Sequence, residues 1–120
     1  MAEQSNRDKG TIGEDFAVDY LEKLGYFIVK RNFTFGKLGE IDIIAEINKV
    51  LVFVEVRSKF YYDTPDPINS IGFGKRTKLR KAAEGYLFIN KIQDKEMRFD
   101  VIILDFSQKP TQVTHIENAM

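Results

Sequence analysis

The chain has 120 residues, of which 43% are hydrophobic and 30% are charged, and its 18 basic and 18 acidic side chains cancel. This balance predicts one globular domain and excludes a strongly basic DNA-binding protein, so any affinity for nucleic acid would come from a local basic surface. The chain has no cysteine, which excludes disulfides and zinc–thiolate sites, and no apolar run of about 20 residues, so a cytoplasmic location is expected.

The first half of the chain predicts a helix followed by three strands. Residues 1–10 lack the apolar segment of a signal peptide and are expected to form a flexible N-terminal tail. Apolar residues recur at helical spacing over 12–24, which predicts an amphipathic helix. Aromatic and β-branched residues predict a strand over 26–35. Residues 39–59 predict two strands joined by a tight turn, and the proline- and glycine-containing segment 60–74 predicts a long loop.

The second half predicts one helix and two strands. The helix is expected over 75–91, and the strands over 98–106 and 111–116, the last at a sheet edge. Four residues are predicted to face inward from this helix: Leu79, Ala82, Ala83 and Tyr86. The element order predicts a single domain over 11–120 with an α/β fold, a mixed sheet of about five strands flanked by helices.

The hairpin within 39–59 places acidic residues on otherwise apolar strands. A two-residue turn at 48–49 would put Asp42 opposite Glu55 and Glu40 opposite Arg57. Two carboxylates this close are suitable ligands for Mg²⁺ or Mn²⁺, which take oxygen ligands together with water and substrate phosphate. Arg57 would hold a phosphate oxygen. The alternative is a half-solvated strand end with ordinary salt bridges.

Several residues elsewhere are candidates to support such a site. Glu14 flanks the apolar stripe of the first helix and is placed to reach a metal, but Thr11 and Glu14 also match a helix-capping box. Five of the seven residues in 75–81 are basic. Phosphate contacts are predicted from Lys75, Arg76 and Lys78, with a solvated outer face as the alternative.

Four further polar or aromatic residues are considered for a role in the site. Asp100 is a candidate metal ligand, and a salt bridge with Arg98 is the alternative. The single histidine, His115, has no evident acid–base partner. Tyr61 and Tyr62 are candidates either to stack on bases or to cover the edge of the core.

The chain resembles the YraN-like family of bacterial proteins, which are predicted nucleases, over nearly its whole length after the N-terminal tail. The matching segments, in order, are "GED.A..YLEKLGYFIVKRN" (13–32), "GEIDIIA" (39–45), "LVFVEVRSK" (51–59), "K..KLRKAAEGYL" (75–87), "RFDVIIL" (98–104) and "HIENAM" (115–120). That family is similar to archaeal Holliday-junction resolvases and to the restriction-endonuclease-like fold, whose signature is an acid followed by Glu-x-Lys on the next strand.

The resemblance implies roles for particular residues. Asp42 and Glu55 would be metal ligands, and Glu14 would be the helix carboxylate of the site. Arg57 would occupy the position of the signature lysine. Because arginine stays charged and cannot act as a base, this position departs from the signature.

A proton-handling lysine would then come from Lys75 or Lys59, which are also expected to contact nucleic acid. The resemblance implies a magnesium- or manganese-dependent endonuclease acting on DNA, with branched recombination intermediates as its substrate class, and a homodimer. The alternatives are a non-catalytic nucleic-acid-binding module on the same scaffold, and a protein-interaction domain whose acids are surface residues.

Overall fold

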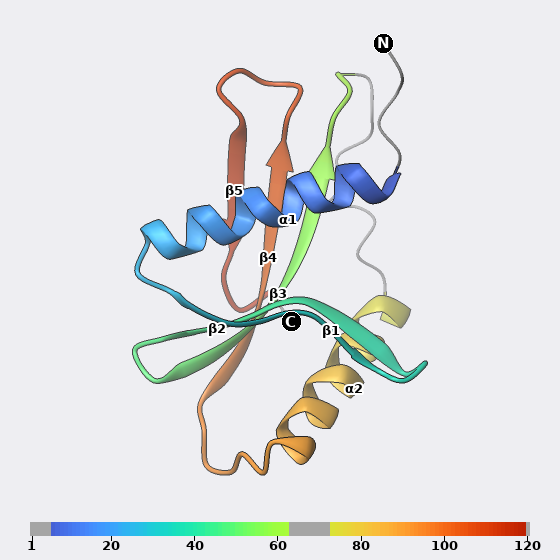
Figure 1. The fold of residues 1–120 in the computed structure, drawn as a ribbon, viewed down its shortest axis with the longest axis vertical. Helices are drawn as coiled ribbons and strands as arrows, with labels where there is room; N and C mark the ends of the chain where they lie inside the picture. The colour runs from blue at the N-terminus through green and yellow to red at the C-terminus, as the bar shows by residue number, and fades with distance from the viewer. Residues whose placement is uncertain (1–5, 63–72, 120) are drawn as a thin grey trace.

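The computed structural model describes the backbone of residues 6–62 and 73–119, and the side chains of residues 9–62 and 76–119. Two helices and five strands follow one another along the chain: α1 (Asn6–Lys23), β1 (Phe27–Phe35), β2 (Gly39–Ile47), β3 (Val50–Lys59), α2 (Phe73–Ile89), β4 (Met97–Asp105) and β5 (Gln112–Ile116) (Figure 1). Neither of these helices is long and apolar enough to cross a membrane.

The strands form one mixed sheet in the order β1-β2-β3-β4-β5. All neighbours are antiparallel except β3 and β4, which run parallel on either side of the crossover that contains α2. The predicted α/β fold with a five-stranded mixed sheet flanked by helices is therefore confirmed, and it is consistent with a restriction-endonuclease-like fold. Parallel neighbours require such a crossover, because after β3 the chain must return to the end of the sheet at which β3 began before β4 can run in the same direction.

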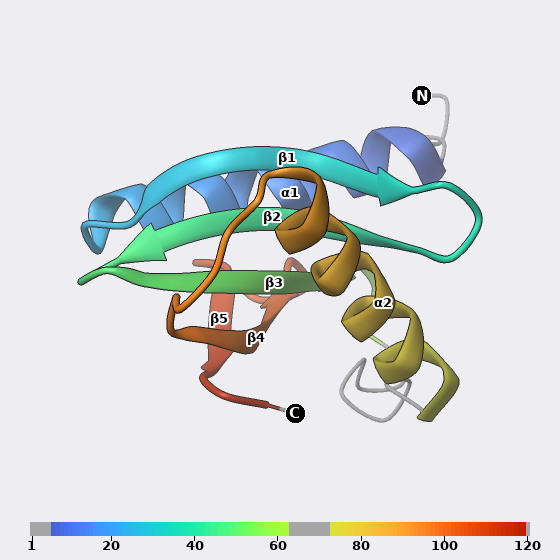
Figure 2. The same cartoon turned by 90° about the horizontal axis from the view of Figure 1, so that it is seen from below.

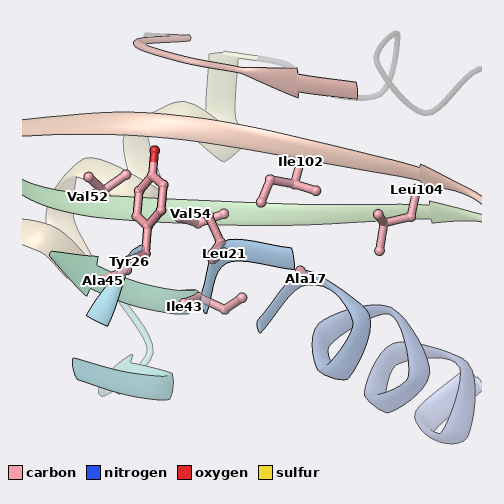
Figure 3. Packing of buried hydrophobic residues seen from close by; sticks show 9 residues of the cluster. All are labelled: Ala17, Leu21, Tyr26, Ile43, Ala45, Val52, Val54, Ile102 and Leu104. Carbon is pink, nitrogen blue, oxygen red and sulfur yellow. The ribbon is translucent and has the colours of Figure 1, made fainter. Parts of the chain in front are cut away.

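The core lies on both faces of the sheet, since successive side chains of a strand point to opposite faces. Val52 and Val54 of β3 pack with Ala17 and Leu21 of α1 (Figure 3). Phe53, between them on β3, instead packs with α2. The four residues predicted to face inward from α2 are all buried there, namely Leu79, Ala82, Ala83 and Tyr86. The two helices thus cover opposite faces of the sheet (Figure 2).

The helix boundaries differ from those predicted. Helix α1 begins at Asn6 instead of residue 12, so residues 6–10 are helical and not part of a tail. Thr11 and Glu14 lie inside the helix, and the predicted capping box is wrong. The first turns contain no apolar residue, so hydrophobic periodicity gave no signal there. Helix α2 begins and ends two residues earlier than the predicted range 75–91.

Gly39, at the start of β2, lets this strand approach the backbone of α2. A Cβ atom at Gly39 would lie 2.1 Å from the carbonyl oxygen of Lys78. We therefore expect Gly39→Ala to lower the free energy of unfolding by about 1–3 kcal/mol, measured by urea denaturation. Gly10→Ala is the matched control, since a Cβ at this helical glycine meets nothing within 4 Å and should stabilise the protein by about 0.5–1 kcal/mol. Equal stability of the two variants would contradict the close approach.

Candidate active site

The predicted hairpin forms, and its two strands then part. Asn48 and Lys49 form the two-residue turn, both with positive φ, as a type I′ turn requires. The ladder between β2 and β3 runs through five pairs and ends at Ile43–Val54. Beyond this point β2 stays paired with β1, and β3 continues beside β4 (Figure 1). We call this point, where β2 and β3 part, the fork.

Asp42 is the first residue of β2 beyond the ladder, and its side chain is half-buried. The backbone N–H of Val56 donates a hydrogen bond to Asp42 Oδ2 over 2.8 Å. The Val56 N–H needs an acceptor because β2 leaves β3 at this point. The Asp42 carboxylate takes the place of a β2 backbone carbonyl that would accept this bond if the ladder continued. Asp42 therefore lies beside β3 near Glu55, although the ladder ends one pair before them. The predicted placement of Glu40 opposite Arg57 is wrong, because Glu40 lies beyond the fork, where β2 pairs with β1 alone.

Glu55 and Arg57 lie on the sheet face that α2 covers, because they alternate with Val54 and Val56 on the opposite face. Glu55 is only 4% exposed. Arg57 Nε lies 3.3 Å from Glu55 Oε1, and within the described part of the chain this buried nitrogen has no hydrogen-bond partner. A buried donor without an acceptor is uncommon in folded proteins and marks a place where a ligand oxygen would be favoured.

Glu14 has different neighbours from those predicted. Arg31 Nε donates to Glu14 Oε1 over 2.6 Å, and Asn32 Nδ2 donates to the same oxygen over 3.1 Å. Arg31 also pairs with Asp15, and these two carboxylates raise the pKa of the guanidinium, the Asp15 bond contributing most. No feature of the sequence indicated Arg31 as this partner, because the contact joins α1 to β1.

The structure therefore does not assemble the expected set of three metal ligands. Among residues 9–62 and 76–119, no three His, Cys, Asp or Glu side chains group closely enough to hold a metal ion. Helix α1, which carries Glu14, covers the face opposite Glu55. The candidate site consists of Asp42, Glu55 and Arg57 at the fork.

The predicted nucleic-acid-binding residues have different outcomes. Arg76 and Lys78 are exposed on α2, as a phosphate-binding role requires. Lys59 is half-buried at the end of β3, on the same side as Arg57 by alternation. Lys75 belongs to α2, but its side chain lies outside the described residues. Tyr61 is exposed and accepts a hydrogen bond from Lys9 over 2.7 Å, so base stacking by this residue stays a prediction.

A second polar cluster, far from the fork in sequence, surrounds Asp100. Arg98 donates to both carboxylate oxygens over 3.0 and 3.1 Å, which confirms the predicted salt bridge. His115 Nε2 lies 2.7 Å from Asp100 Oδ2, and its Nδ1 lies 3.1 Å from the hydroxyl of Tyr20. The expectation that His115 lacks an acid–base partner is therefore wrong. The backbone N–H of Asn118 completes the set of donors to Asp100.

Comparison with known proteins identifies a family. The model of "Uncharacterised protein family UPF0102" matches residues 13–104. The chain belongs to this family. A UPF0102 protein of Clostridium botulinum strain Hall is 43% identical over 117 residues, covering 95% of this chain and 94% of the relative. A UPF0102 protein of Alkaliphilus oremlandii is 39% identical over 116 residues, covering 95% and 98%. One from Dictyoglomus turgidum is 37% identical over 105 residues, covering 88% of each.

Proposed function

We propose that this UPF0102 protein is a divalent-metal-dependent endonuclease that hydrolyses phosphodiester bonds of DNA in the cytoplasm. The observation that carries the proposal is the fork, where Asp42 and Glu55 lie on neighbouring strands beside Arg57. The Val56 N–H contacts Asp42 and the Arg57 guanidinium contacts Glu55, and a divalent cation would add favourable interactions to both carboxylates. A cationic side chain next to them suits a substrate that is itself an anion.

The residues at the fork fit a magnesium or manganese ion held by two protein ligands. Mg²⁺ commonly takes one or two carboxylates and fills its remaining positions with water and phosphate oxygens. Asp42 and Glu55 would supply those carboxylates, and the DNA would supply the phosphate. When bound, the ion would polarise the scissile phosphate and activate the attacking water.

The remaining side chains at the fork would act on the phosphate. Arg57 would direct its guanidinium to a non-bridging phosphate oxygen and stabilise the charge that develops there. Because a guanidinium does not release its proton, Arg57 would orient the substrate and not serve as a base. Lys59, two residues further along β3, would carry positive charge toward the neighbouring phosphate.

The test is a cleavage assay on labelled four-way-junction, duplex and single-stranded DNA. We expect cleavage with Mg²⁺ or Mn²⁺ and none in EDTA, with the junction as the preferred substrate. The Asp42→Asn protein, purified in the same way, controls for contaminating nuclease. Failure of the wild-type protein to cut any of these substrates with either metal would overturn the proposal.

Two observations favour a second function, a non-catalytic nucleic-acid-binding module. The described residues contain no group of three acidic or histidine ligands, and the signature lysine is replaced by Arg57. Such a module would bind DNA equally well in EDTA and in Mg²⁺ and would cut none of it.

Symmetric cutting of a branched substrate would need two copies of the chain, so a homodimer on DNA belongs to the first proposal, the endonuclease. Sedimentation with and without junction DNA tests for this dimer.

A further inference from the structure

A pocket of about 290 Å³ lies between the β1–β2 turn and α2. Figures 1 and 2 both show α2 alongside the end of the β1–β2 hairpin that carries the β1–β2 turn. The side chains that line it belong to four polar residues and one apolar residue: Thr34, Lys37, Glu40, Lys78 and Leu79. We call this hollow the turn pocket. It shares β2 with the fork, since Glu40 precedes Asp42 by two residues.

The shape of the turn pocket depends on two glycines. Gly39 lets β2 lie against the carbonyl of Lys78, and Gly36 adopts a positive φ of 54° in the turn. Leu79 is 4% exposed and anchors this part of α2 in the core. Lys78 is therefore carried by a helix that packing holds in place, whereas Lys37 lies in the exposed β1–β2 turn.

The charges in the turn pocket favour an anion. Lys37 and Lys78 supply two ammonium groups, Thr34 supplies a hydroxyl donor, and Glu40 is the single acid in the lining. Further along α2, Arg80 and Lys81 are exposed and add positive charge on the same helix. An oxyanion with several acceptor oxygens matches this set of donors, and phosphate is the oxyanion that repeats along a nucleic-acid strand.

The position of the pocket relative to the fork also fits a nucleic-acid strand. Residues 40 and 42 of β2 are separated by about 6.6 Å along the strand, because each residue rises about 3.3 Å. A DNA strand whose scissile phosphate lies at Asp42 would thus bring a neighbouring backbone phosphate close to the turn pocket.

We propose that the turn pocket is a subsite for a backbone phosphate of DNA, held by Lys37 and Lys78, close to the phosphate at the fork. This inference rests on the proposed function, because it takes the same strand as substrate. It adds Lys37, which the sequence did not indicate, to the DNA-binding surface. It also assigns Glu40 an opposing effect, since its carboxylate repels the phosphate.

The test measures binding of a fluorescent DNA junction in EDTA, where no cleavage occurs, over a series of salt concentrations. Lys37→Gln with Lys78→Gln should weaken binding roughly tenfold for each lost contact at about 0.1 M salt, and should reduce the slope of log affinity against log salt by about 1 to 2. Glu40→Gln should strengthen binding. Lys23→Gln is the matched control, because this exposed lysine lies on α1 over the opposite face, and it should leave affinity and slope unchanged.

Each outcome decides the inference. If the double variant and Lys23→Gln bind DNA with the same affinity and slope, the subsite is wrong, while metal-dependent cleavage lost in Asp42→Asn would still support the nuclease. If wild type binds no DNA at any salt concentration, the proposed function fails with the subsite. Calorimetric titration with inorganic phosphate tests whether the turn pocket binds free phosphate or the phosphate of a DNA backbone. Tight phosphate binding that the double variant loses, without any loss of DNA affinity, would assign the pocket to free phosphate and overturn the subsite.

Discussion

Replacing Asp42 by Asn is expected to lower the rate of metal-dependent DNA cleavage at least about 100-fold, because a neutral amide replaces a charged ligand of the cation. The Asn side-chain oxygen can still accept the Val56 N–H bond, so the fold at the fork should persist. DNA binding in EDTA should be unchanged. Glu55→Gln should show the same separation of cleavage from binding. Cleavage rates and calorimetric titration with Mg²⁺ measure the two effects.

Glu46→Gln is the control for these two variants. Glu46 lies on the same strand as Asp42, inside the ladder near its turn end, where its side chain pairs with Lys95. Its loss should change neither metal binding nor cleavage. Cleavage by Asp42→Asn at the wild-type rate would show that Asp42 serves only as an acceptor for the β3 backbone, and the candidate site would then be wrong.

Replacing Asp100 by Ala is expected to lower the free energy of unfolding by about 3–5 kcal/mol, since this leaves a cation and a histidine without their buried anion. Asp100 is 1% exposed and joins Arg98 on its own strand to His115 on β5 and to the backbone of Asn118. Arg98 and His115 contact Tyr26 and Tyr20 in turn, so the cluster links β4 and β5 to α1 and to the start of β1. Urea denaturation at pH 7 measures the loss.

The same carboxylate predicts how stability depends on pH. Burial acts to raise the pKa of Asp100, but hydrogen bonds from His115, Arg98 and Asn118 outweigh it, and the pKa lies below its usual value. A lowered folded-state pKa contributes stability above the unfolded value of about 3.9, and this contribution disappears as pH falls through the folded pKa. The wild type should therefore lose stability below about pH 4, and Asp100→Asn should lack that part of the loss.

A surface ion pair provides the comparison for both measurements. Asp19 pairs with Lys23 on α1, and both side chains are well exposed. Asp19→Asn should unfold at the same urea concentration as wild type and should keep the wild-type response to acid. If Asp100→Ala were as stable as this variant, the cluster around Asp100 would not hold β5 and the C-terminal residues to the sheet.

Features governed by short-range chemistry could be inferred from residue order. The turn at Asn48 and Lys49 follows from the preference of two-residue hairpins for residues that tolerate positive φ. That turn sets the register that brings Asp42 beside β3. Alternation then places Glu55 and Arg57 on one face. The salt bridge between Arg98 and Asp100 also joins residues two apart on one strand, so its partners were evident without a fold.

Contacts between distant segments could be decided only by packing. Residue order gives no indication that Glu14 would meet Arg31, or that His115 would meet Tyr20 across 95 residues of chain. These pairs form because helix α1 lies over a particular part of one sheet face. The fork and the turn pocket arise in the same way, where β2 leaves β3 and Gly39 admits the backbone of α2. Strand patterns specify which residues share a face, but the twist of the sheet and the position of each helix determine which of them meet.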